Sequence, residues 1–401
     1  MMDKPAYLKD FATAANTRFE ELEWPNKKTE EWRRTPGSKF PLERVPALPG
    51  TGSFSTQDYG AYSAVLEISQ GQTRVLHRDS SAEDLIIDSA GAPGTEWIKG
   101  ALEFHLAQCD NKVLASHLKN ITSLHGVKFP KNTKGEKPVL VLVRENRPGV
   151  MIQPHLAVKS EELSDWELIL RYESPDNSQI LVNGASTFMV GDGARLHVTE
   201  VQLLDNTSFF LDHALADLGR DGVMDHLNVS LGALVTKGRL SVKLSGTGSD
   251  LHTRGLYFAL GDQHKDLKVI QDHIAEKATS RALYKGAVRD RARSVFQGLI
   301  IVEENAAGTD AYLSNKNLLM NDGARADSLP QLKIDNNDVK CSHGSTTGKV
   351  DEEEVYYLQS RGFSKQEAKL LIAQGLFAEL VAAAPEVLKE ELEHLVAEAV
   401  V

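Results

Sequence analysis

The chain has 401 residues, of which 41% are hydrophobic, and its 56 acidic and 45 basic residues give a formal net charge of -11. This length is enough for two or three packed units, because single hydrophobic cores stop growing at about 250 to 300 residues. The acidic balance argues against binding to a phosphate backbone, so we expect no nucleic-acid partner.

The two cysteines, Cys109 and Cys341, are far apart in the sequence. They provide no disulfide framework and no CxxC metal or redox motif, and their scarcity favours a reducing compartment. The N-terminal residues are charged throughout and lack the apolar core of a signal peptide. No stretch approaches the roughly 18 uninterrupted apolar residues of a membrane span. We therefore expect a cytoplasmic protein that does not contact a membrane.

Residues 1–135 are predicted to be mostly helical with loops. Apolar residues recur at helical spacing around Phe11 and Ala15, and again between Trp97 and Leu124. This pattern indicates an N-terminal helical region.

Residues 136–340 contain short runs that are typical of β-strands, such as the alternating apolar residues of 239–245. Glycines that include Gly238 and Gly255 are interpreted as turn residues between these runs. Because the glycine spacing is uneven, the pattern alone leaves a sandwich, a barrel and a β-helix open.

Residues 341–401 are predicted to form a small helical unit. Asp351 with Glu354 is typical of a capping box at a helix start, and Gly362 is a stop signal. Ser364 with Glu367 repeats the capping pattern, and an amphipathic pattern near the end of the chain predicts a further helix.

Cys341 and His343 are two residues apart on a segment predicted to be extended, so their side chains should project to the same side. Thiolate and imidazole both suit iron or zinc, but two donors do not fill a coordination sphere, so a partner chain is the natural source of the others. His343 is followed by polar residues that predict a flexible loop, which favours it as the functional residue. Cys341 could equally be a buried, inert side chain.

The segment 333–372 contains DVKCSHG, an acidic helix start and YLQSRG. It resembles the C-terminal signature of the SufB/SufD family of iron–sulfur cluster assembly proteins, and of its SufD branch in particular. The resemblance extends more loosely through 263–334 and to PNKKTEEWRRTP at 25–36. It implies a mainly β fold, with a right-handed parallel β-helix core over 136–340 flanked by N-terminal and C-terminal helical regions, the last of which docks an ATPase.

The resemblance also implies a function. The chain would be a non-catalytic scaffold subunit that pairs with SufB through the β-helix ends, binds the SufC ATPase, and forms a homodimer in isolation. His343 and Cys341 would be candidate metal ligands of a nascent iron–sulfur cluster shared transiently with SufB, with reduced flavin as an electron source in the complex. The C-terminal residues of interface-forming types, which we expect to bind the ATPase, are Tyr356, Tyr357, Arg361 and Phe363.

Three alternatives remain. The first is a SufB-type scaffold paralogue, although the low cysteine content and the motif CSHG favour SufD. The second is a β-helical carbohydrate-active enzyme using carboxylates such as Asp205, Asp212 and Asp225, whose spacing gives no pairing. The third is a structural adaptor in which Cys341 and His343 only stabilise a dimer interface. The sequence contains no GxxxxGK[ST] phosphate loop, so any ATPase activity must come from a partner protein.

Two further groups of polar residues are interpreted as structural. His264 and His273 lack the tight spacing of metal ligands. A basic cluster is expected to be an ion-paired face, with a route for sulfur or a flavin phosphate as the alternative. Its members are Lys285, Arg289, Arg291 and Arg293.

Overall fold

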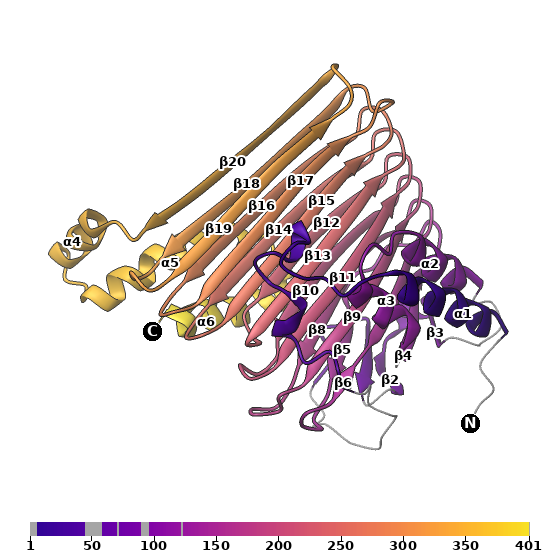
Figure 1. Ribbon diagram of the computed structural model, residues 1–401, viewed down its shortest axis with the longest axis horizontal. Coiled ribbons are helices and arrows are strands. Elements are labelled where there is room, and N and C mark those ends of the chain that lie inside the picture. The colour runs from indigo at the N-terminus through magenta and orange to yellow at the C-terminus, as the bar shows by residue number, and fades with distance from the viewer. Residues whose placement is uncertain (1–5, 45–57, 70–71, 90–95, 122, 401) are drawn as a thin grey trace.

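A computed structural model describes residues 6–44, 58–69, 72–89, 96–121 and 123–400 of the chain (Figure 1). The strands form two ten-stranded sheets, which we call sheet A and sheet B. In spatial order, sheet B consists of β2 (Gln72–Arg78), β1 (Ala64–Ser69), β5 (Val139–Arg144), β8 (Asp165–Glu173), β10 (Arg195–Leu203), β12 (Val223–Ser230), β14 (Asp250–Ala259), β16 (Thr279–Val288), β18 (Thr309–Leu319) and β20 (Val339–Lys349).

Sheet A has the same construction. Its strands in spatial order are β19 (Arg325–Ile334), β17 (Arg293–Val302), β15 (His264–His273), β13 (Val235–Leu244), β11 (Phe209–Leu218), β9 (Leu181–Val190), β7 (Pro154–Ser160), β4 (Ser123–Phe129) and β3 (Ile86–Ser89), and the short β6 (Met151–Ile152) also pairs with β9. Only the first strands depart from parallel pairing, since β2 is antiparallel to β1 and β3 is antiparallel to β4.

From β7 onward, successive strands lie mostly in alternate sheets, and each pairs in parallel with the next strand of its own sheet. Asp250 in β14 lies opposite Thr279 in β16, and Thr279 is followed by Asp310 in β18, so consecutive coils take 29 and 31 residues. The chain therefore winds as a parallel β-solenoid, with helices at both ends of the sequence (Figure 1). The prediction of a mainly β, β-helical core is confirmed.

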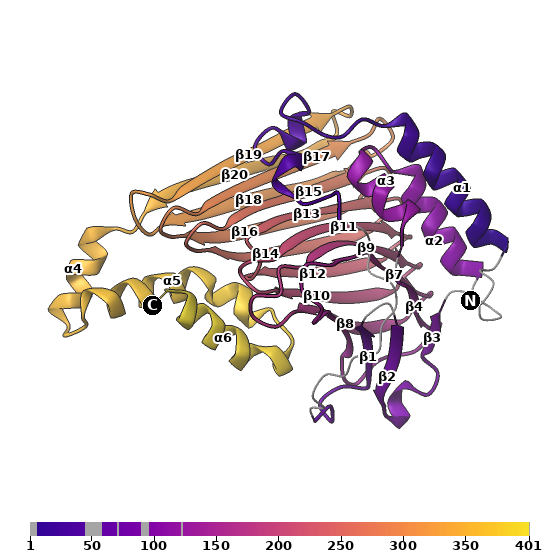
Figure 2. The same cartoon turned by 60° about the horizontal axis from the view of Figure 1, so that its bottom comes forward.

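The helices cover the outer faces of the two sheets (Figure 2). On the side of sheet A, α2 and α3 contact β9, and α1 packs on both helices. On the side of sheet B, α5 contacts β14 and β16. The helices are α1 (Ala6–Glu21), α2 (Glu96–Ala107), α3 (Lys112–Lys119), α4 (Glu352–Ser360), α5 (Lys365–Ala382) and α6 (Glu386–Val400), and short 3-10 helices are η1 (Glu30–Trp32), η2 (Gly37–Lys39) and η3 (Ser80–Ala82).

The solenoid interior is filled by alternate residues of each strand, because successive side chains point to opposite faces. One buried apolar cluster runs from the first coils to Leu251, and a second surrounds Tyr257 and Phe296 in the later coils. A third lies outside sheet B, where Phe377 and Leu392 of the C-terminal helices are buried. The helices are thus part of the folded body rather than a separate tail.

Two polar contacts also fix the C-terminal helices to sheet B. The guanidinium of Arg171 in β8 donates to both carboxylate oxygens of Glu391 in α6, at 2.7 and 2.8 Å. Lys285 in β16 donates to the carbonyl oxygen of Leu376 in α5 at 2.8 Å. Paired and largely buried charges of this kind fix an orientation, because breaking one leaves the other unsatisfied.

The structure differs from two sequence-based expectations. Residues 1–135 contain four strands, β1 to β4, in addition to the helices, so this region supplies the first edge of both sheets. Gly238 and Gly255 lie inside strands and not in turns. A Cβ at Gly255 would lie 2.1 Å from the ring of Tyr284, so this glycine makes room for a large interior side chain.

Candidate functional site

The last coil of the solenoid ends in β19 of sheet A and β20 of sheet B. Within the described residues, no further strand pairs with the outer edge of either one. Each edge therefore presents backbone N–H and C=O groups that can pair with another chain. This open end is the part of the fold that carries the ligand residues predicted from the sequence.

Cys341 and His343 both lie in β20 and not in a flexible loop, which corrects the loop prediction for His343. Cys341 is opposite Ala311 and His343 is opposite Leu313 in β18, and both of these partners are buried in the interior. The two side chains therefore share the inner face of the strand, as their spacing predicted. Cys341 is half-buried against the later interior cluster, whereas His343 is exposed.

The two side chains differ as potential ligands. Burial raises the pKa of the Cys341 thiol, and the charge of Asp310 adds to this effect, while a backbone hydrogen bond at Ala311 opposes it. A thiol with a raised pKa is mostly protonated at neutral pH and is a weak ligand until a metal displaces its proton. The exposed imidazole of His343 is the more accessible donor.

These two donors do not make a complete metal site. Among the residues that the structure describes, no group of three or more His, Cys, Asp and Glu side chains could hold a metal ion. A cluster bound at β20 therefore requires donors that are not assembled at this position within the described chain.

Exposed apolar side chains form a rim at the open end of the solenoid, and this rim was not predicted from the sequence. Leu332 and Ile334 in β19, which lie opposite the buried Ile300 and Val302 of β17, are 38% and 40% exposed. In the sequence, Leu332 and Ile334 alternate with polar residues, which is a signal for a strand face. Nothing in that pattern shows that the face is left uncovered at the edge of the solenoid.

The predicted ATPase-docking residues lie on α4 and just after it. This helix lies beyond the end of β20, at the far side of the molecule from α1 (Figure 1). Tyr356 and Tyr357 are 74% and 57% exposed, and Phe363 is 41% exposed. Arg361 lies over the Tyr357 ring at 5.2 Å and donates to its hydroxyl, so these two residues form one unit. The described structure leaves these aromatic side chains largely uncovered.

The capping predictions for these helices can be compared directly. The side chain of Ser364 accepts from the Glu367 backbone and the Glu367 carboxylate accepts from the Ser364 backbone, which confirms the capping box. Asp351 caps α4 by accepting from the backbone N–H of Glu353. The contact is therefore to Glu353 and not to Glu354, which was the partner predicted from the sequence. Gly362 ends the helix with a φ of 99°, as its position indicated.

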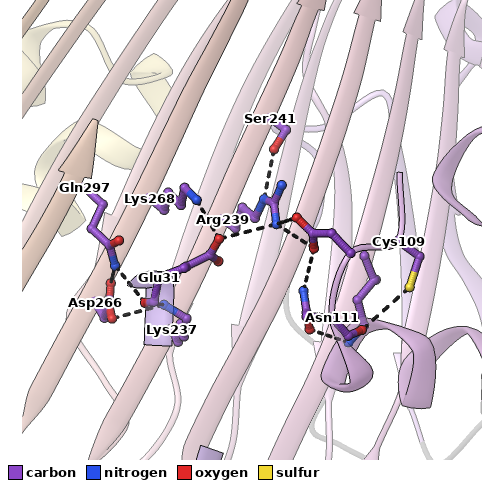
Figure 3. A network of polar contacts seen from close by, with 11 residues as sticks. Glu31, Cys109, Asn111, Lys237, Arg239, Ser241, Asp266, Lys268 and Gln297 are labelled. Carbon is purple, nitrogen blue, oxygen red and sulfur yellow. Dashed lines mark hydrogen bonds and ion pairs between the residues drawn. The ribbon is translucent and has the colours of Figure 1, made fainter. Parts of the chain in front are cut away.

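The N-terminal segment around PNKKTEEWRRTP crosses the outer face of sheet A and is fixed there by a polar network (Figure 3). The carboxylate of Glu31 lies among Lys268 and Arg239, and its backbone carbonyl accepts from Lys237 and Gln297, each at 3.1 Å. Trp32 is buried beneath the Lys237 ammonium, 4.8 Å from the ring centre. From sequence, this segment was singled out only by its resemblance to the family, and no physical role was predicted for it.

The other polar candidates have structural partners. His264 hydrogen-bonds with Thr35, and His273 with Ser280. The basic cluster is ion-paired, as preferred from the sequence. Its pairs are Lys285 with Glu379, Arg289 with Asp290, Arg291 with Asp262 and Arg293 with Asp327.

The three carboxylates of the carbohydrate-enzyme alternative do not converge. Asp205 caps a turn through Thr207 and Ser208, and Asp212 is in the solenoid interior. Asp225 contacts His197 on the outer face of sheet B at 3.1 Å. Acid and base residues of a glycosidase must flank one bond, and these three side chains do not share a face.

Fold and site together define a class: a parallel β-solenoid whose open terminal coil, and not an enclosed pocket, carries the candidate ligands. The family model described as "SUF system FeS cluster assembly, SufBD core domain" matches residues 143–376, which is more than half of the chain. The chain belongs to this SufBD family of iron–sulfur cluster assembly proteins.

Curated relatives agree with this assignment. A SufBD family iron–sulfur cluster assembly protein of Mycobacterium tuberculosis is 33% identical over 298 residues, which cover 71% of this chain and 74% of the relative. SufD of Escherichia coli is 35% identical over 49% of this chain and 47% of its own length. SufD of Bacillus subtilis is 25% identical over 98% of this chain and 94% of its own length. In the described part of the chain, no helix is both long and apolar enough to span a membrane.

Proposed function

We propose that the chain is a SufD-type scaffold subunit of a cytoplasmic SUF complex, in which it pairs with SufB and binds the SufC ATPase to support de novo cluster formation. The observation that carries this proposal is the exposed His343 on the inner face of β20, a strand whose outer edge is unpaired within the described residues. The relatives named SufD support the choice of branch over a SufB-type paralogue.

The open coil is suited to pairing with a second solenoid. Strand addition would satisfy the free backbone groups of β19 and β20 and would cover the apolar rim formed by Leu332 and Ile334. In the proposed heterodimer this surface faces SufB. In isolated protein, a second copy of the chain would occupy the same surface, which gives the homodimer.

In this proposal, the nascent cluster is bound at the interface between the two subunits. His343 supplies an imidazole nitrogen from β20, and Cys341 supplies a thiolate only after losing the proton that its raised pKa retains. The remaining donors come from SufB in this proposal, because the described part of this chain offers no third ligand at the site. Division of the donors between two subunits makes cluster formation depend on the complex.

The C-terminal helices are the proposed docking site for SufC. The exposed aromatic side chains of Tyr356, Tyr357 and Phe363 provide anchors of the kind that dominate interface energetics, next to Arg361. Arg171 and Lys285 connect α6 and α5 to sheet B, so a displacement of these helices by an ATP-driven partner would act on the solenoid. Reduced flavin remains the proposed electron source of the complex, on the basis of the resemblance.

The test is reconstitution of the chain with SufB and SufC, followed by iron and sulfide analysis. We expect His343→Ala to leave the complex intact and to reduce cluster formation strongly, whereas Ser345→Ala, at the next inward-facing position of β20, should leave it unchanged. Loss of complex assembly by His343→Ala would favour the structural adaptor instead. Unchanged assembly and unchanged cluster formation would refute both roles.

A second set of variants tests the docking of the ATPase. Tyr356→Ala together with Phe363→Ala should abolish co-purification of SufC while retaining SufB. Val75→Ala is a matched control, because Val75 is 51% exposed in β2, at the opposite edge of sheet B from β20. Retention of SufC by the double variant would refute the proposed docking site.

A further inference from the structure

The interior of the solenoid contains a cluster of ionisable side chains that the proposed function does not use. Glu200 in β10, Asp212 in β11 and His226 in β12 all point inward, and they are 4%, 4% and 2% exposed. Other inward positions on these strands hold apolar residues such as Val198 and Met224 or uncharged polar residues such as Gln202 and Ser230. Ionisable groups are rarely this deeply buried without a specific partner.

Several atoms of this cluster lack a hydrogen-bond partner. They are Glu200 Oε1, Asp212 Oδ1, His226 Nε2 and Asn228 Oδ1. All four residues line one cavity of about 20 Å³, which has room for a single water molecule. The remaining contacts of the cluster are loose, since His226 Nε2 is 3.8 Å from a Glu200 oxygen and His226 Nδ1 is 3.4 Å from the hydroxyl of Thr253.

Among the described residues that line this cavity, no cationic side chain offsets the two carboxyl groups from inside the solenoid. Arg239 and Lys268 also line the cavity, but their charged ends form ion pairs with Glu31 on the outer face of sheet A. The other ionisable neighbours are the phenol groups of Tyr172 in β8 and Tyr284 in β16, which burial keeps neutral by raising their pKa values.

Two adjacent carboxylates in such an environment are unstable as a pair of anions. Burial raises the pKa of Asp212 well above its ordinary value, and the charge of Glu200 raises it further. A bound metal ion would neutralise the two carboxylates less well than a proton. No three-ligand arrangement exists among the described residues, and the cavity cannot hold a hydrated ion.

We propose that Glu200, Asp212 and His226 form an internal proton-binding site, in which one carboxyl group stays protonated at neutral pH and donates a hydrogen bond within the cluster. The proton converts two competing acceptors into a donor and an acceptor, as in carboxyl pairs that share one proton. The site does not depend on SufB, SufC or an iron–sulfur cluster.

Infrared spectroscopy of the full-length protein provides a direct test. At neutral pH, the native protein should show the carbonyl stretch of a protonated, buried carboxylic acid, and carboxyl-¹³C labelling of aspartate or glutamate should shift this band. Asp212→Asn should remove the band, whereas Asp225→Asn, which changes an outer-face carboxylate, should leave it in place. Absence of the band from the native protein, or its survival in Asp212→Asn, would overturn the proposal.

Thermal unfolding is an independent test. The proton site predicts that removing the Asp212 carboxyl group raises the melting temperature at high pH, which a purely structural role does not predict. A carboxyl group with a raised pKa in the folded state costs stability as pH rises above its unfolded pKa. Asp212→Asn should therefore melt a few degrees above the native protein at pH 8 and not at pH 4, while Asp225→Asn, which changes a carboxylate whose folded pKa is lowered, should not melt above the native protein at pH 8. A metal ion found at one per chain and lost in Asp212→Asn would also refute the proton site.

Discussion

The substitution Glu31→Gln should destabilise the protein by about 3 kcal/mol at neutral pH. Burial alone would raise the pKa of Glu31, but the charges of Arg239, Lys237 and Lys268 outweigh it and lower the pKa from 4.5 to about 2. At about 1.4 kcal/mol for each pH unit between the folded and unfolded values, the carboxylate contributes about 3 kcal/mol. Because the folded pKa is the lower one, this stability is complete above pH 4.5 and disappears as pH falls through about 2.

Urea denaturation followed by tryptophan fluorescence measures this effect. The free-energy difference between the native protein and Glu31→Gln should be largest at pH 7 and should shrink steadily as the pH is lowered below about 4. Glu30→Gln is a matched control, since Glu30 is exposed and hydrogen-bonds with Gln331, and its cost should stay within about 0.5 kcal/mol. Equal losses for the two variants, or a Glu31→Gln loss that is independent of pH, would refute the reasoning.

Two further predictions concern the interior and the outer face of sheet B. Gly286→Ala should cost more than about 2 kcal/mol in urea denaturation, because its Cβ would lie 1.8 Å from the Tyr257 ring, whereas Gly100→Ala in α2 meets no atom within 4 Å and should be neutral or stabilising. Equal tolerance of both alanines would contradict the interior packing. His197→Gln should lower the melting temperature near pH 5, and this effect should fade as pH rises through the folded pKa of His197, because the hydrogen bond to Asp225 raises that pKa and the ion pair is lost once the imidazole deprotonates. As His197 is 40% exposed, the loss should stay below about 1 kcal/mol, and a loss that grows with pH would be inconsistent with the pair.

Local signals predicted the helical end of the chain well. The capping box at Ser364 and the stop at Gly362 are found as expected, because both depend on contacts within a few residues. The first strands of the sheets were not predicted, because they depend on contacts between residues that are far apart in the chain. The strand Ala64–Ser69 is buried on both faces, and such a short apolar run does not differ from a helix segment until its pairing with Val139–Arg144 is known.

The spacing of Cys341 and His343 predicted their shared face, but not the strand that holds them. Their segment is polar and rich in glycine and threonine, which is typical of a loop, and it is extended because it pairs with β18 along its whole length. The interior cluster and the Glu31 network were also beyond sequence reasoning. Glu31 and Arg239 are far apart in the chain, and only the winding of the solenoid brings them together.

The two ends of the solenoid offer different strand edges to a neighbouring chain. At one end, both sheets finish with an antiparallel strand, β2 or β3, which reverses the direction of the ladder. At the other end, β19 and β20 continue the parallel winding to its last residue. A neighbouring chain that adds to β19 or β20 can therefore continue the same parallel ladder, whereas one that adds to β2 or β3 meets a strand that runs against the winding.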